Sequence, residues 1–152
     1  MSVDINPRLK ELIRNFGAEI GLADLALDED GFCSLTFDGK VTANLQLAQG
    51  GDTLVLFADL GPASAELYES LLRANFFWQA TQGATLSVTG DEPRAVIAVQ
   101  LSWGVMTATA LGERVRRFVD AAEDWADYVS GGGEFAGAAA DADGEMSAFV
   151  KV

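Results

Sequence analysis

Alternation of apolar and polar residues is the feature that most constrains the fold of this chain. In residues 41–47 every second residue is apolar, and the residues between are polar. This period of two is typical of a β-strand with one buried face. Residues 32–37 alternate in a similar way, and the dipeptide Asp38-Gly39 between the two stretches is a strong hairpin signal. The centre of the chain is therefore predicted to form an antiparallel sheet.

Three further stretches are expected to complete this sheet. Residues 53–59 are almost continuously apolar, which predicts a strand covered on both faces. Residues 60–62, Leu-Gly-Pro, are expected to break the sheet after that strand. Two more strands are predicted at 84–89 and 95–103, with a turn between them.

Helical patterns precede, interrupt and follow the strands. Residues 7–20 carry an apolar stripe, with Asn6 as the expected N-cap and Pro7 at the first helical position. A second helix is predicted from about residue 62 or 64 to 76, and a third over 107–129. The order α-β-β-β-α-β-β-α predicts an α+β domain, a twisted antiparallel sheet with helices packed on it.

The charge balance restricts the possible partners. Ten basic and 23 acidic residues give a formal charge of −13, which argues against nucleic acid and anionic membranes as partners. The acidity suits a partner polypeptide that is basic or amphipathic, although it is also explained by solubility alone. No apolar run has the length of a membrane span, and the N-terminus lacks the core of a signal peptide. A cytoplasmic protein is therefore expected.

The chain is expected to be organised as one domain with a tail. Residues 1–130 contain all the predicted helices and strands, whereas 131–152 are rich in Gly, Ala and Asp. Such a composition has few groups that offset the entropy lost on ordering, so a flexible C-terminal tail is predicted.

Catalytic chemistry is conspicuously missing from the sequence. There is no histidine, which removes the commonest general base and metal ligand. Cys33 is in step with the apolar residues of its strand and is predicted to be a buried, inert thiol. The acidic residues of 24–30 lack the spacing of a calcium loop, and no glycine motif matches a nucleotide loop. No catalytic residue, metal site or cofactor is predicted, and the protein is not expected to be an enzyme.

A family resemblance lies in the second half of the chain. Leu71-Leu72-Arg73-Ala74-Asn75 ends the second predicted helix, Gly83-Ala84-Thr85-Leu86 follows as a turn and strand, and Ala122-Glu123-Asp124-Trp125 lies in the last helix. With the order of elements, this pattern resembles the type III secretion chaperones of the Tir-chaperone (CesT-like) family, class I. The resemblance covers roughly residues 5–130.

The resemblance implies a homodimeric, non-enzymatic chaperone in the bacterial cytoplasm, connected with virulence. Such a chaperone binds the extended N-terminal segment of a secreted effector and keeps it soluble, and the secretion ATPase is a further partner. An extended peptide satisfies its backbone by adding to a sheet edge, while its side chains fill apolar pockets.

Two sets of site residues are predicted on this basis. The effector-binding set consists of Leu9, Leu12, Phe16, Leu35, Phe37, Leu45 and Leu47. The dimer-interface set consists of Leu71, Phe77, Trp78, Leu86, Val88, Val96 and Ala98. The alternative for both sets is that these side chains form the core of a single chain. At the level of function, the alternatives are a small acidic dimeric adaptor without a secretion role and a weakly recognisable enzyme that uses carboxylates alone.

Overall fold

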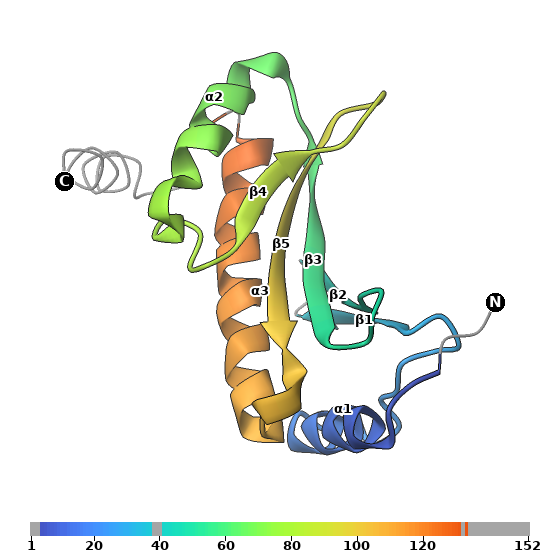
Figure 1. The fold of residues 1–152 in the computed structure, drawn as a ribbon. Helices are drawn as coiled ribbons and strands as arrows, with labels where there is room; N and C mark the ends of the chain where they lie inside the picture. Colours follow the sequence, from blue (N-terminus) through green and yellow to red (C-terminus); the bar gives the residue numbers. More distant parts are fainter. Residues whose placement is uncertain (1–3, 38–40, 132, 134–152) are drawn as a thin grey trace.

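The structure, a computed structural model, describes residues 4–37, 41–131 and 133. These residues form one sheet with helices at its face and end (Figure 1). In chain order the elements are α1 (Pro7–Glu19), β1 (Phe32–Phe37), β2 (Val41–Leu47), β3 (Thr53–Pro62), α2 (Ala65–Ala74), the 3-10 helix η1 (Phe76–Trp78), β4 (Thr85–Val88), β5 (Arg94–Ser102), the 3-10 helix η2 (Trp103–Val105) and α3 (Ala108–Ser130).

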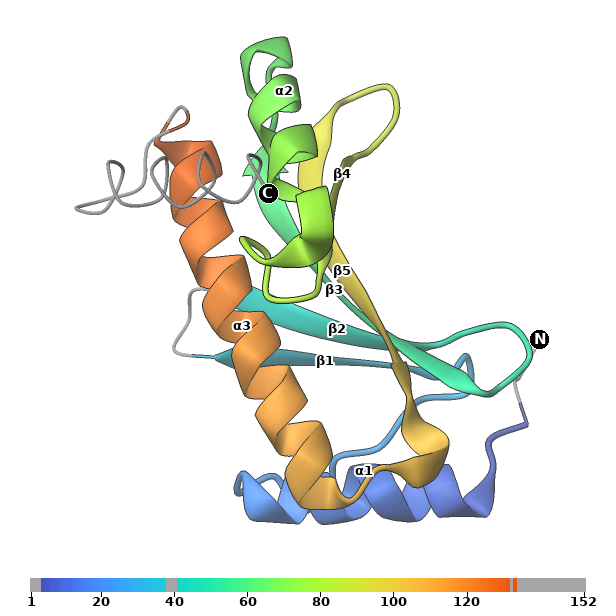
Figure 2. The same ribbon diagram turned by 60° about the vertical axis from the view of Figure 1, so that its left-hand side comes forward.

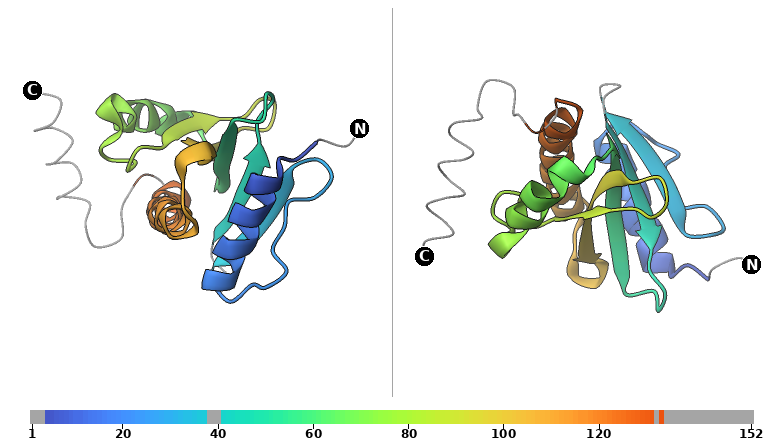
Figure 3. Two further views of the ribbon diagram at one scale, coloured as in Figure 1. Left: turned by 60° about the horizontal axis from the view of Figure 1, so that its bottom comes forward. Right: turned by 90° about the horizontal axis from the view of Figure 1, so that it is seen from above.

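The five strands form a single antiparallel sheet in the order β1-β2-β3-β5-β4. Helices α2 and α3 lie on one side of it, and α3 runs along the middle strands (Figure 3). The predicted α+β fold and the predicted order of helices and strands are confirmed. β1 and β4 are the two end strands, so the sheet has two edges.

Helix α1 begins and ends where its sequence indicates. The Asn6 side chain accepts a hydrogen bond from the Arg8 backbone N–H at 2.8 Å, and Pro7 follows the cap. At the other end, the Leu22 N–H donates to the Gly17 carbonyl at 2.7 Å, which folds the chain back against the helix. α1 lies across the lower end of α3 (Figure 2), so it closes the end of the core.

The core lies between the sheet and the helices. Along β3 every second side chain from Leu54 to Leu60 is buried, and β5 contributes Ile97 and Leu101. α3 supplies a stripe that includes the fully buried Leu111. Cys33 lies in the same core, and its pKa is raised to about 11 by burial and by the nearby Asp28 carboxylate. Since only the thiolate is nucleophilic, this cysteine has the properties of an inert core residue, as predicted.

Strand β3 differs from its prediction in two respects. The sheet does not break at residues 60–62, because β3 continues to Pro62, which pairs with Arg94. A register shift between Asp59 and Gly61, with Gly61 at φ +111°, absorbs the irregularity. The strand is also not equally covered on both faces. The face that carries Leu54 and Leu56 is buried, whereas the face that carries Val55 and Phe57 is only half-buried.

Two predictions fall on residues that the structure leaves undescribed. The β1–β2 pairing is confirmed from Phe32↔Gln46 to Phe37↔Val41, but the turn at 38–40 lies outside the described residues. The same holds for residues 134–152 of the predicted tail. None of the helices among the described residues combines the length and the apolar composition needed to span a bilayer.

Candidate protein-interaction surfaces

The predicted effector-binding side chains lie almost entirely inside the single chain. Leu9, Phe16 and Leu45 are fully buried. The others are buried Leu12, Leu35 and Leu47 and half-buried Phe37. A peptide on the folded surface does not reach a fully buried side chain. In the single chain these residues therefore lie as expected if they form its core. A direct contact between these residues and an effector stays a prediction.

The edge at β1 is open along part of its length. The Gly31 carbonyl accepts a hydrogen bond from the Leu47 N–H of β2 at 2.8 Å. The next carbonyl, that of Phe32, accepts from the Asp28 N–H at 2.8 Å, on the side away from β2. The turn before β1 therefore covers the edge at Phe32.

Beyond Phe32, the backbone groups of β1 alternate in direction. Because successive residues of an antiparallel strand point their N–H and C=O groups to opposite sides, those of Ser34 and Thr36 point to the edge. No strand of the described residues lies beyond them, since β1 ends the sheet. Their side chains are occupied on the sheet face, Ser34 with Asn44 at 2.8 Å and Thr36 with Thr42 at 3.0 Å. The site offers one donor and one acceptor at each residue to an added strand.

The opposite edge, at β4, is covered at Leu86 by a side chain, whereas the backbone of Val88 faces the same edge without this cover. The Asn75 carboxamide accepts from the Leu86 N–H at 2.8 Å and donates to the Leu86 carbonyl at 2.9 Å. Asn75 thus makes the two bonds that a neighbouring strand would make. It is the last residue of the Leu-Leu-x-Ala-Asn segment, so the structure gives that segment a physical role.

The predicted dimer-interface residues divide into buried and exposed groups. Leu71 and Leu86 are buried in the core. Val96 and Ala98 are half-buried on the face of the sheet opposite α3. The exposed group consists of Phe77, Trp78 and Val88. Only the exposed and half-buried members are available to a second copy of the chain, and the dimer itself stays a prediction.

Two members of the exposed group, Phe77 and Trp78, belong to a larger apolar surface at the end of α2. We call it the aromatic shelf, and it consists of Leu72, Phe76, Phe77 and Trp78, which are 70%, 47%, 61% and 52% exposed. The Phe76 and Phe77 rings pack edge to face, with centroids 4.4 Å apart. Contiguous exposed apolar side chains of this size mark an interaction surface.

The backbone of the aromatic shelf is strained. Phe77 and Trp78 both have φ of +55°, a region that costs a bulky residue about 1–2 kcal/mol. Hydrogen bonds hold the turn in place: the Trp78 N–H donates to the Asn75 carbonyl, and the Gly83 N–H donates to the Trp78 carbonyl. Strain that keeps two aromatic side chains at the surface points to a function for them.

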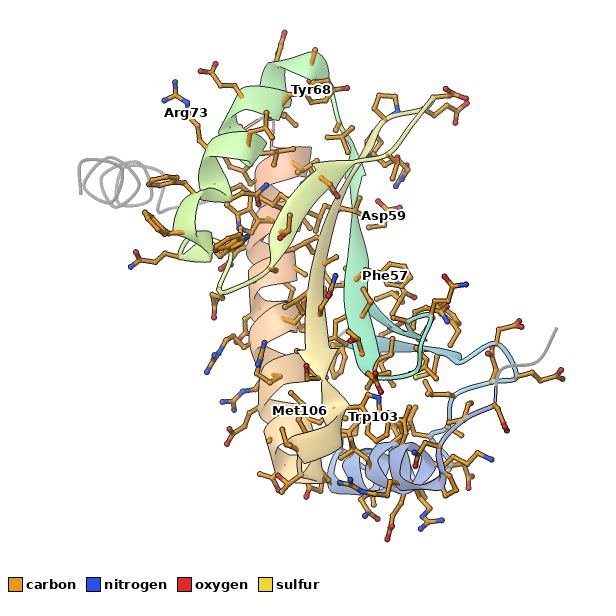
Figure 4. All side chains as sticks on the ribbon, in the orientation of Figure 1. Phe57, Asp59, Tyr68, Arg73, Trp103 and Met106 are labelled. Carbon is orange, nitrogen blue, oxygen red and sulfur yellow. The ribbon has the colours of Figure 1, made fainter. Side chains whose placement is uncertain are left out.

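The face of the sheet opposite α3 has an apolar centre. Phe57 projects from β3 away from α3 (Figure 4) and packs against Phe32 with ring centroids 6.4 Å apart. Val55, Val96 and Ala98 surround it and are half-buried. No helix of the described part of the chain covers these side chains, so this face is a second candidate contact area.

A cavity of about 580 Å³ lies where the N-terminus of α1 meets η2 and the β2–β3 turn. Ile5, Leu47 and Trp103 supply apolar walls, and the Trp103 indole donates to the Gly51 carbonyl at 2.8 Å. The charged groups at the cavity are Asp4, Arg8 and Asp52. The described residues contain no cluster of side chains suited to a metal ion.

Comparison with known proteins identifies the family. A model of the Tir chaperone protein (CesT) family matches residues 11–126, so the chain belongs to this family, and the resemblance noted in the sequence is confirmed. The transcriptional anti-antiactivator ExsC of Pseudomonas aeruginosa is 38% identical over 58 residues, which are 38% of this chain. The chain spans about 40% of the length of this curated relative.

Solved structures show the same fold. The crystal structure of the ExsC-ExsE complex has a TM-score of 0.72 at 24% identity, covering 84% of this chain and 97% of that chain. The HopA1-SchA chaperone-effector complex has a TM-score of 0.68 at 16% identity, covering 78% and 93%. At these identities the likeness establishes the fold alone.

Three features of these surfaces were missed by the sequence reasoning. Asn75 belongs to the Leu-Leu-x-Ala-Asn motif, but nothing local in the sequence indicates that it pairs with a residue of β4. The cavity beside Trp103 is formed by three segments far apart in the chain. The positive φ angles at Phe77 and Trp78 also had no signal, because left-handed residues are normally marked by Gly or Asn.

Proposed function

We propose that this protein is a cytoplasmic chaperone of type III secretion that binds the extended N-terminal segment of an effector. Membership of the Tir chaperone protein (CesT) family is the observation that carries the proposal. It is a binding function, and no enzymatic activity is part of it.

The open edge of β1 is the proposed primary contact for the effector. An added strand would pair with the backbone of Ser34 and Thr36, so its main chain is satisfied without the effector folding. Backbone pairing suits a chaperone because it depends little on the effector's side chains. Apolar contact on the half-buried Phe32 and Phe37 would add affinity.

A second copy of the chain is the proposed occupant of the aromatic shelf. In a symmetric dimer the same patch is used twice, so each exposed apolar side chain is buried in both copies. Phe77, Trp78 and Val88 are the exposed candidates, with Val96 and Ala98 on the neighbouring sheet face. The buried Leu71 and Leu86 would support this interface from within.

Co-expression tests the proposal. The chain is co-expressed with the N-terminal region of a secreted protein encoded by a neighbouring gene. The molar mass of the purified complex is then measured by light scattering. We expect a soluble complex with two copies of this chain, and no complex when the effector's N-terminal segment is deleted. Failure with every effector encoded by the organism would contradict the proposal.

A second candidate function is the capture of a regulatory protein. It is favoured by the 38% identity to a protein named a transcriptional anti-antiactivator. The same β1 edge would then bind a regulator instead of secreted cargo. Deleting the gene separates the two: loss of transcription of secretion genes, with effector stability unchanged, would favour the regulatory role.

A further inference from the structure

The cavity beside Trp103, which we call the Trp103 cavity, has an apolar floor and a charged rim. Its buried lining residues are Leu47 and Trp103, which form the floor. The side chains of Asp4, Arg8 and Asp52 also line it, and all three are exposed, so they form the rim. A ligand in this cavity therefore meets apolar surface below and charged groups at the mouth.

The carboxylates of the rim have no partner within the described part of the chain. Asp4 and Asp52 form neither an ion pair nor a side-chain hydrogen bond with another described residue. The one cation of the lining, Arg8, is held elsewhere, because its guanidinium donates to the Gly104 carbonyl at 3.0 Å. Two carboxylates against one guanidinium give the lining a net charge of −1, and neither carboxylate is paired with Arg8.

An acidic turn borders the wall of the Trp103 cavity. The Leu47 N–H donates to the Gly31 carbonyl at 2.8 Å, which holds the turn of residues 28–31 beside the end of β2 that supplies Leu47. This turn carries Asp28, Glu29 and Asp30 and no basic residue. In Figure 2 the β2–β3 turn and the N-terminal end of α1 lie at the same end of the sheet as the start of β1. Negative charge therefore extends from the rim of the cavity to the start of β1.

The same turn connects the Trp103 cavity with the open edge of β1. It covers that edge at Phe32, whose carbonyl accepts from the Asp28 N–H, so a strand added beside Ser34 and Thr36 must leave the edge there. Neighbouring strands lie about 4.8 Å apart, and an extended chain advances about 3.3 Å per residue. About four residues therefore span the distance from the added strand to the β2–β3 turn, and one bound polypeptide can reach both sites.

A lysine or arginine side chain matches the chemistry of the cavity. Its aliphatic stem packs on apolar surface while its charged head stays at the mouth, where Asp4 and Asp52 can accept hydrogen bonds from it. A carboxylate would be repelled by the same two groups. An uncharged apolar side chain would remove water from them without giving them a partner. The net charge of −13 of the chain favours a cation further.

We propose that the Trp103 cavity binds a lysine or arginine of the effector, in the segment that adjoins the strand added to β1. The charged head pairs with Asp4 and Asp52, and the stem lies on Leu47 and Trp103. This proposal rests on the function proposed above, because it takes the bound polypeptide to be the effector at the β1 edge. It adds a requirement on the effector, a basic residue about four positions from the paired strand.

NMR on the ¹⁵N-labelled full-length protein tests the cavity without any strand pairing. The probe is the capped tripeptide acetyl-Ala-Arg-Leu-amide, and its counterpart has citrulline, which has the shape of arginine without its charge. We expect the arginine peptide to shift the indole N–H signal of Trp103 and the amide signal of Asp52 to saturation. The citrulline peptide should bind at least about fivefold more weakly, and added salt should weaken only the arginine peptide.

Charge variants assign the binding to the rim. Asp4→Asn/Asp52→Asn should weaken binding of the arginine peptide about tenfold and leave the fold intact, because both side chains are exposed. Asp91→Asn/Glu92→Gln removes the same charge before β5, whereas the cavity follows β5, and should change binding by less than about twofold. Equal binding of the citrulline peptide, an equal loss in this control, or equal shifts of the Trp78 and Trp125 indole signals would overturn the proposal.

The complex obtained by co-expression shows whether the effector uses the cavity. Its dissociation constant should rise about tenfold with Asp4→Asn/Asp52→Asn and stay unchanged with Asp91→Asn/Glu92→Gln. A complex that is insensitive to the first pair would overturn this proposal and leave the proposed function intact. If no effector forms a complex although the arginine peptide binds, the proposed function fails, and the assignment of the cavity to an effector fails with it.

Discussion

The two edges of the sheet differ in how their backbone groups are covered. At β4, the Asn75 carboxamide forms both hydrogen bonds to the backbone of Leu86 and takes the place of a further strand. At β1, the backbone groups of Ser34 and Thr36 face outward with no strand of the described residues beside them. An exposed edge invites pairing with another chain; Asn75 removes the Leu86 position from such pairing, whereas β1 leaves two successive outward positions, Ser34 and Thr36, available.

The largest expected effect comes from blocking the open edge. Ser34→Pro removes an outward N–H and places a ring where the added strand would lie, so effector binding should weaken about a hundredfold. The variant should retain its fold, because the N–H that pairs with β2 is not touched. Isothermal titration calorimetry with an effector segment measures the affinity, and urea unfolding measures the fold.

Leu35→Pro is the matched control for that experiment. Its N–H faces β2 and its side chain is buried, so it should lower the free energy of unfolding by more than about 4 kcal/mol. If Ser34→Pro unfolds the protein equally, the backbone of residue 34 does not face the edge.

Uncovering Leu86 at the β4 edge should have the next largest effect. Asn75→Ala removes two hydrogen bonds and leaves the Leu86 backbone unpaired, which should cost about 2–3 kcal/mol of unfolding free energy. Asn75→Asp keeps the acceptor and should cost about half as much. If Asn75→Ala is as stable as the native chain in urea, the carboxamide does not cover the Leu86 backbone.

A smaller effect is expected at the aromatic shelf, next to the β4 edge. Phe77→Asn replaces an exposed ring with a residue that tolerates positive φ. The dimer should dissociate about tenfold more readily, because the apolar contact is lost from both copies. Sedimentation equilibrium measures the dissociation constant of the dimer. An unchanged constant in the variant, or a native chain that is monomeric at micromolar concentration, would exclude the aromatic shelf as the dimer interface.

The smallest effect concerns Asp59, between the two edges at the bulge of β3. Partial burial raises its pKa, but the Arg94 side chain and the Gly61 N–H outweigh this and lower it. A lowered pKa stabilises the fold at neutral pH, and that contribution is lost as pH falls through the folded-state pKa. Asp59→Asn should therefore cost at most about 0.5 kcal/mol at neutral pH, because the pair is exposed, and nothing in acid. Urea unfolding at both pH values measures the difference in unfolding free energy between the variant and the native chain. A larger difference in acid than at neutral pH would contradict a lowered pKa of Asp59.

The elements of this fold follow closely from local patterns in the sequence. Alternation in residues 41–47 gave β2, and Asn6-Pro7 marked the beginning of α1. The continuation of β3 past Gly61 was missed, because a bulge depends on the partner strand and not on local propensity.

The interaction surfaces were much less predictable than the fold. An apolar stripe looks the same whether it packs inside a chain or against a partner. The stripes of Leu9 and Leu45 predict contact with an effector, and in the single chain both side chains lie in the core. Exposure depends on how the whole chain folds, and so does the cover of the Leu86 backbone by Asn75, eleven positions earlier in the sequence.

Amide hydrogen exchange at the two edges tests the central claim most directly. Exchange is followed residue by residue by NMR, with and without a bound effector segment. If the effector adds to β1, the amides of Ser34 and Thr36 gain protection, while those of Cys33, Leu35 and Leu86 change little because they are already paired. Unchanged exchange at Ser34 and Thr36, or new protection confined to β4, would contradict it.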